Sequence, residues 1–163
     1  MLEQLLLTAA LLAMLSTSML AGIYFIFSNT IMPSLKRTTA GVEVMQEINR
    51  RIQNRFFFML FFGSAISSVV VITASSLISP PLFRPLLAFA ALFSILAFLS
   101  TVLANVPLNN RLNDLASNQE STKEIWAYYL IKWVHWNHVR VALCALSASL
   151  YGTEILNMTP VIA

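Results

Sequence analysis

The chain of 163 residues is 58% hydrophobic and only 10% charged, and its mean hydropathy is +0.74. Soluble domains carry about 25% charged residues, so this composition excludes an ordinary water-soluble globule. The formal net charge of +3 is spread over the chain without a run of Lys or Arg, which argues against a nucleic-acid-binding protein. The length allows one domain, and we interpret residues 1–163 as a single transmembrane domain.

Four apolar stretches are long enough to cross a hydrocarbon core of about 30 Å as helices. They cover residues 5–27, 56–78, 82–104 and 134–156. The predicted fold class is all-α: an integral membrane four-helix bundle of two helical hairpins that run in the same direction. Pro33 and Pro107 predict the ends of the first and third helices, because proline breaks a helix interior. The second helix is expected to run unbroken from residue 41 to 78, and the second and fourth helices are expected to extend into the cytoplasm.

The distribution of positive charge predicts the orientation. Lys36, Arg37, Arg50, Arg51 and Arg55 flank the connection after the first span, and Arg111, Lys123, Lys132 and Arg140 flank the connection after the third. Arg84 alone lies on the opposite side. The positive-inside rule therefore places both long connections in the cytoplasm and both termini outside. The charge bias and the short chain fit a bacterial inner membrane.

Polar and small residues follow one face of each predicted helix at helical spacing. These faces comprise Ser18, Gly22, Phe25 and Asn29 on the first helix; Asn49, Gln53, Phe56, Leu60, Gly63 and Ser67 on the second; Ser94, Phe98, Thr101 and Asn105 on the third; and Trp126, Tyr129, Trp133, Trp136, Asn137, Arg140, Cys144, Ser147 and Tyr151 on the fourth. If all four faces point inward, Asn29, Asn49, Asn105, Asn137 and Arg140 form a polar floor beneath an aromatic cavity.

A plain packing interpretation competes with this cavity. Small residues and amides commonly serve helix–helix packing, and Trp and Tyr commonly form a belt at the membrane surface. Arg140 favours a ligand site, because an Arg inside a span costs at least ~2.5 kcal/mol at the helix centre. Such a residue usually has a polar or anionic partner, and no Asp or Glu faces it within the predicted spans.

His135 and His138 are the only histidines, spaced i, i+3 on the fourth helix. They could bind a metal or haem, or act as an acid–base pair. On a helical wheel they point away from the aromatic face. Two histidines without an intramembrane carboxylate also offer few ligands for a metal ion. We therefore predict no bound cofactor and no metal, with haem or metal binding through these histidines as the alternative.

Four segments resemble signatures of the anthrone oxygenase-like family of small four-helix membrane proteins. They are Phe27-Ser28-Asn29-Thr30-Ile31-Met32-Pro33-Ser34-Leu35, Met45-Gln46-Glu47-Ile48-Asn49, Asn105-Val106-Pro107-Leu108-Asn109-Asn110-Arg111-Leu112 and Trp133-Val134-His135-Trp136-Asn137-His138-Val139-Arg140. The resemblance covers nearly the whole chain in the right order. It implies oxidation of an anthrone to an anthraquinone, as some fungal members are associated with, without a bound metal or flavin.

On this hypothesis Trp133 and Trp136 stack on a planar phenolic substrate drawn from the bilayer. Asn105 and Asn137 bind its carbonyl oxygen, Arg140 stabilises the enolate, and His138 is the candidate base. Asn29, Asn49 and Asn109 complete the expected substrate-binding set.

Two other functions remain open from the sequence. The first is a non-enzymatic membrane module that binds a lipid, a quinone or a partner protein. The second is transport of a hydrophobic solute, for which four helices leave little room unless the chain forms a homo-oligomer.

Overall fold

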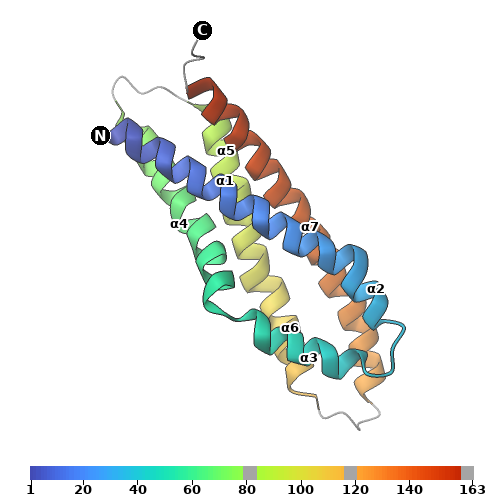
Figure 1. Cartoon of the computed structure of the whole chain (residues 1–163). Coiled ribbons are helices and arrows are strands. Elements are labelled where there is room, and N and C mark those ends of the chain that lie inside the picture. The colour runs from blue at the N-terminus through green and yellow to red at the C-terminus, as the bar shows by residue number, and fades with distance from the viewer. Residues whose placement is uncertain (79–83, 116–120, 159–163) are drawn as a thin grey trace.

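A computed structural model describes residues 1–78, 84–115 and 121–158, and all regular structure within these residues is helical. The α-helices are α1 (Leu2–Ile26), α2 (Met32–Leu35), α3 (Gly41–Ile52), α4 (Arg55–Leu77), α5 (Pro85–Ser100), α6 (Val106–Asn113) and α7 (Ser121–Met158). Two π-helical segments, η1 (Phe27–Ile31) and η2 (Thr101–Asn105), join α1 to α2 and α5 to α6. Figure 1 shows an elongated bundle in which α1 starts and α7 ends at the same end.

Four helices of the described chain are long and apolar enough to cross a membrane, as the sequence predicts. They cover Leu2–Leu35, Arg55–Leu77, Pro85–Asn113 and Thr122–Met158. The first two residues of the predicted third span, at positions 82 and 83, lie outside the described residues. Both α1 and α5 pack against α4 and α7, so the four long helices form a closed ring. These helices indicate an integral membrane protein.

The two prolines do not end their helices, and this sequence prediction was wrong. Pro33 and Pro107 each follow a π-helical segment by two residues, and the helical path continues through α2 and α6. In a regular α-helix a proline ring collides with the carbonyl group four residues earlier. Those carbonyls belong to Asn29 in η1 and Leu103 in η2. The wider π turn gives the ring room, so the helix bulges instead of stopping.

The second predicted helix is broken, contrary to the expectation of one helix from residue 41 to 78. α3 ends at Ile52 and α4 begins at Arg55. Asn54 has extended backbone angles, and its side-chain oxygen accepts a hydrogen bond from the Phe57 backbone N–H at 3.0 Å. Asn is among the strongest N-cap residues, so it starts a new helix here instead of continuing the old one. The predicted long fourth helix is present as α7.

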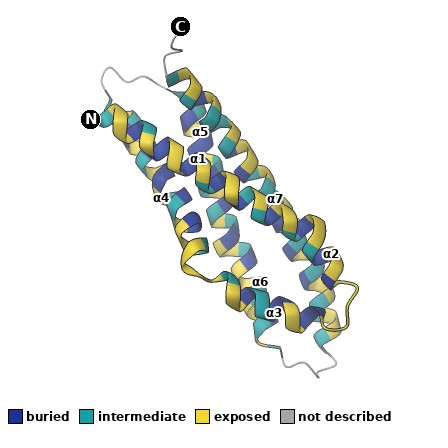
Figure 2. Cartoon of the chain, in the orientation of Figure 1, coloured by how far each residue is buried: buried dark blue, intermediate teal, exposed yellow. Residues whose placement is uncertain are grey.

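In the half of the bundle nearest the start of α1, small and polar side chains join the helices, and a pocket of about 290 Å³ beside Glu3, Ser75 and Arg84 lies at its end. Ser147 Oγ on α7 donates to the Ala90 carbonyl on α5 at 2.7 Å, and Tyr151 OH donates to Ser68 Oγ on α4 at 3.0 Å. These small and polar side chains let the helices approach closely. Figure 2 shows buried residues toward the axis of the bundle and exposed ones on its outer surface. Ser147 and Tyr151, two polar residues of the predicted inward face, therefore serve helix packing.

Candidate functional site

A cavity of about 260 Å³ lies in the other half of the bundle, where α3, α6 and both π segments approach α7. Aromatic and aliphatic side chains of α1, η1, α3 and α4 form most of its wall. The polar residues that line it are Asn49, Gln53, Thr101, Asn109, Asn110 and Arg140. The volume is slightly below the range of about 300–1,000 Å³ typical of drug-sized ligands, which suits a small planar compound.

Arg140 on α7 lines this cavity and is only 4% exposed. Its guanidinium lies 4.2 Å from the centre of the Tyr24 ring and 5.3 Å from that of Trp133. Aromatic faces attract a cation, so these two rings replace part of its lost hydration. Its Nε has no hydrogen-bond partner, and no carboxylate of the described residues forms an ion pair with it. The site therefore keeps an uncompensated positive charge.

Asn137 connects Arg140 to the first π segment. It is fully buried, and its side-chain oxygen accepts from Arg140 Nη2 at 2.6 Å. Its amide nitrogen donates to the Tyr24 carbonyl and to Ser28 Oγ, both at 2.5 Å. The Tyr24 carbonyl lies where α1 changes to η1, and a π turn shifts the backbone hydrogen bonds by one residue. Asn137 thus fixes the bulge and the arginine together.

The second π segment supplies Asn105, which is also fully buried. With its amide oxygen toward α7, Asn105 accepts from Arg140 Nη2 at 3.0 Å. Two buried amides, Asn137 from the same helix and Asn105 from the neighbouring π segment, therefore hold one nitrogen of the guanidinium. Because both act as acceptors, they stabilise the cation without neutralising it.

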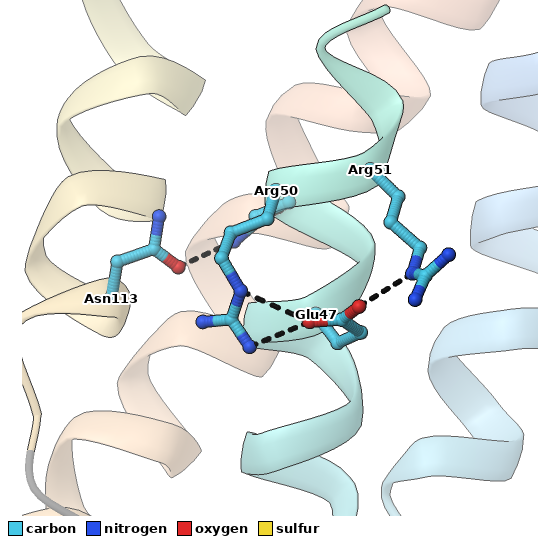
Figure 3. A network of polar contacts seen from close by, with 5 residues as sticks. Glu47, Arg50, Arg51 and Asn113 are labelled. Carbon is cyan, nitrogen blue, oxygen red and sulfur yellow. Dashed lines mark hydrogen bonds and ion pairs between the residues drawn. The ribbon is translucent and has the colours of Figure 1, made fainter.

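Asn109 and Asn49 form the end of the cavity that is farthest from the start of α1. Asn109 accepts from Tyr129 OH and from Trp133 Nε1, both at 2.8 Å, and so fixes the aromatic wall. Asn49 on α3 is 2% exposed and donates to Asn113 Oδ1 at 3.4 Å. Figure 3 shows this contact from α3 to α6 beside the exposed charges of α3. α3 therefore closes the cavity as a floor.

The structure thus brings most of the predicted site residues together. Asn49, Asn105, Asn109, Trp133, Asn137 and Arg140 lie in or against the cavity. Most residues of the inward faces predicted for the third and fourth helices are buried, but Phe98 and Trp126 are half-buried and Trp136 is exposed.

Four predicted residues lie elsewhere. Asn29, Trp136, His135 and His138 are exposed and do not line the cavity. The face chosen for the first helix was wrong, since Gly22 and Phe25 are exposed with Asn29.

The inner face of α1 instead carries Ala13, Thr17, Leu20 and Tyr24. Ser18 points outward because its hydroxyl donates to the Met14 carbonyl at 2.7 Å and needs no partner from another helix.

The sequence analysis missed Tyr24, Phe57 and Phe61, which line the cavity. Tyr24 could have been found, because it follows Leu20 and Thr17 at helical spacing and precedes Ser28 by one turn. Phe57 and Phe61 stack at 5.8 Å and lie among several phenylalanines, so their facing depends on the break before α4. Within the described residues no group of three or more His, Cys, Asp or Glu side chains is placed to hold a metal ion.

Comparison with known proteins gives one family. The sequence model of the family described as Anthrone oxygenase matches residues 51–150, which include α4, α5, η2, α6 and most of α7. No curated protein and no solved structure matches the chain.

Proposed function

The chain belongs to the anthrone oxygenase family, and on that premise we propose that it is a membrane oxygenase that oxidises an anthrone-type phenolic compound without a bound metal or flavin. The observation that carries the proposal is Arg140, a buried cation with an unpartnered Nε in a cavity whose other lining side chains are aromatic, aliphatic or uncharged polar. Such a site suits a planar compound that carries its negative charge on an enolate oxygen.

The chemistry requires little from the protein once the substrate is ionised. Loss of one proton from the CH₂ group opposite the carbonyl gives an enolate whose charge lies largely on oxygen. The enolate transfers one electron to dioxygen, and the resulting radical and superoxide combine to form a C–O bond. The peroxide then loses water to give the second carbonyl. Overall one dioxygen is consumed, and one quinone and one water are formed.

Arg140 is the group that favours the ionised substrate. Its charge stabilises the enolate oxygen, and Asn105 and Asn137 hold the guanidinium so that it need not reorganise. The cavity lining contains no carboxylate and no imidazole. We therefore propose that the substrate gives its proton to water and that the site selects the enolate, with no role for His138 as base.

Replacing Arg140 with Leu tests the proposal. We expect oxygen uptake with a hydroxyanthrone to fall at least about 100-fold, in the range seen when one preorganised donor is removed from an active site. Lys132→Gln is the matched control, because it removes an exposed charge from the same helix. Purified protein in lipid nanodiscs is assayed against the uncatalysed rate. Unchanged uptake by Arg140→Leu contradicts the proposal, and a large loss in His138→Gln returns the base role to that histidine.

The second candidate is a non-catalytic module that binds a quinone or another planar compound. The same cavity supports it, because a neutral carbonyl also accepts from Arg140. Quenching of the tryptophan fluorescence by ligand without oxygen uptake above the uncatalysed rate would favour this function.

We also propose the orientation of the bundle. The cavity end carries nearly all the Lys and Arg residues, and the opposite end carries Arg84. By the positive-inside rule the cavity end faces the cytoplasm of a bacterial cell, and the start of α1 and the end of α7 face outward. The two hairpins, α1 with α4 and α5 with α7, then run in the same direction across the membrane.

A further inference from the structure

A second hollow lies on the outer surface of the bundle, between η1–α2 and α7. It is a groove of about 520 Å³. Met32, Leu130, Ile131 and Val134 form an apolar floor and wall, and Lys36 and Arg37 lie at the end of α2. Ile131 is 69% exposed, so a large hydrophobic side chain is left uncovered there.

The two cations of the groove are unpaired within the part of the chain that the structure describes. The ion pairs there join Arg50 and Arg51 to Glu47, and Arg84 to Glu154. Lys36 and Arg37 are exposed and lie outside all of them. An apolar channel that ends in two free cations is complementary to an anionic headgroup with an acyl chain.

We propose that this groove binds an anionic phospholipid of the surrounding leaflet. The acyl chain lies along Met32, Ile131 and Val134, and the phosphate lies between Lys36 and Arg37. The argument is independent of the oxygenase proposal, because none of these residues lines the cavity.

The groove and the cavity lie on two sides of the same π segment. Phe27 of η1 lines the cavity, while Ser28, the next residue, lines the groove. Ser28 accepts the hydrogen bond from Asn137, which in turn accepts from Arg140. A lipid in the groove therefore packs against the bulge that positions the buried cation.

Native mass spectrometry of the full chain, released from membranes with equal amounts of phosphatidylglycerol and phosphatidylcholine, tests the proposal. Wild-type protein is expected to retain phosphatidylglycerol preferentially. Lys36→Gln combined with Arg37→Gln should reduce this preference about 30-fold, since each Lys or Arg at a membrane surface contributes about 1 kcal/mol. Arg50→Gln combined with Arg51→Gln is the matched control, because it removes two cations outside the groove and should keep the preference.

A second variant tests the apolar part without changing charge. Ile131→Trp fills the groove and is expected to reduce the retained lipid while the melting temperature stays near the wild-type value. The proposal is overturned if both double variants lose the preference equally, or if Ile131→Trp retains as much lipid as wild type. Displacement of the lipid by inorganic phosphate would reveal a general anion site instead, and a co-purified protein seated there would reveal a partner surface.

Discussion

Arg140 lies in the least favourable place for a charge, inside a bundle of apolar helices. Its neighbours are two amides and two aromatic rings, and none of them carries a negative charge. Breaking or leaving open a buried ion pair typically costs several kcal/mol. No Asp or Glu of the described residues pairs with this charge. The two positions next to the guanidinium carry Asn105 and Asn137 instead. This choice of amides keeps the cation available for a ligand.

Asn105→Asp tests that view directly. The new carboxylate would lie about 3.0 Å from Arg140 Nη2 and act as an internal counter-ion. We expect the affinity for an anionic ligand to fall at least about tenfold, while thermal stability does not fall, because the buried cation gains a partner. A titration of the tryptophan fluorescence with a hydroxyanthraquinone measures the affinity, and a melting curve measures the stability.

The control for this substitution is Asn105→Ala. It removes the same hydrogen bond without adding charge, so it should lower stability and affect ligand affinity less than the carboxylate does. Equal losses of affinity in the two variants would show that the charge of the site is not what binds the ligand.

At the scale of single elements, α3 forms the floor of the cavity. Its Gln46 side chain attaches it to α6 and the residue segment that follows α6. Gln46 Nε2 donates to the Leu112 carbonyl at 2.8 Å and to the Leu115 carbonyl at 3.1 Å. These carbonyls lie at the end of α6, where a helix lacks partners of its own. One side chain therefore caps α6 and anchors α3.

Gln46→Leu keeps the size of the side chain and removes both hydrogen bonds. We expect the free energy of unfolding to fall by about 1–3 kcal/mol, because the Leu112 and Leu115 carbonyls each lose one donor. Amide hydrogen exchange should rise in α3 and remain unchanged in α4 and α7. Glu47→Gln is the control, because Glu47 pairs only with Arg50 and Arg51 of the same exposed helix face. Uniform exchange across all helices would contradict an anchoring role.

The inward face of a helix can be predicted where placing one of its side chains toward lipid would cost much free energy. The face of α7 was predictable because it carries an Arg and an Asn, whose placement toward lipid would be costly. The face of α1 was not, because lipid and protein interior are equally apolar and Ser18 satisfies its own hydroxyl. The cavity residues from α7, η2 and α6 were therefore found, while Tyr24 of α1 was missed.

The π segments were beyond sequence analysis for a related reason. Pro33 and Pro107 mark a disturbance, but whether a helix stops or bulges depends on the contacts that stabilise the bulge. Asn137 supplies one of those contacts across a sequence separation of 113 residues. Asn54 is the opposite case, since a strong N-cap residue could have predicted the break between α3 and α4.

At the scale of the whole molecule, the end opposite the cavity is joined by a partly buried ion pair. Arg84 Nη1 lies 2.6 Å from Glu154 Oε1, and the Glu154 side chain is 7% exposed. This pair ties the start of α5 to the end of α7. Arg84→Gln should lower the free energy of unfolding by about 1–3 kcal/mol, since it leaves the Glu154 carboxylate without its cation. Adding Glu154→Gln should recover most of that loss, as measured in a double-mutant cycle by thermal unfolding in detergent.

The proposed orientation of the bundle places the cavity and the groove near the cytoplasmic side of the membrane. With the cavity end in the cytoplasm, Thr39 in the α2–α3 connection should be inaccessible from outside the cell, and Gln4 near the start of α1 should be accessible. A membrane-impermeant maleimide is therefore expected to label Gln4→Cys in intact cells and Thr39→Cys only after permeabilisation. Cys144 is buried and gives a low background. The reverse pattern would place Arg140 and the groove with Lys36 in the outer leaflet and would exclude a cytoplasmic source for the substrate.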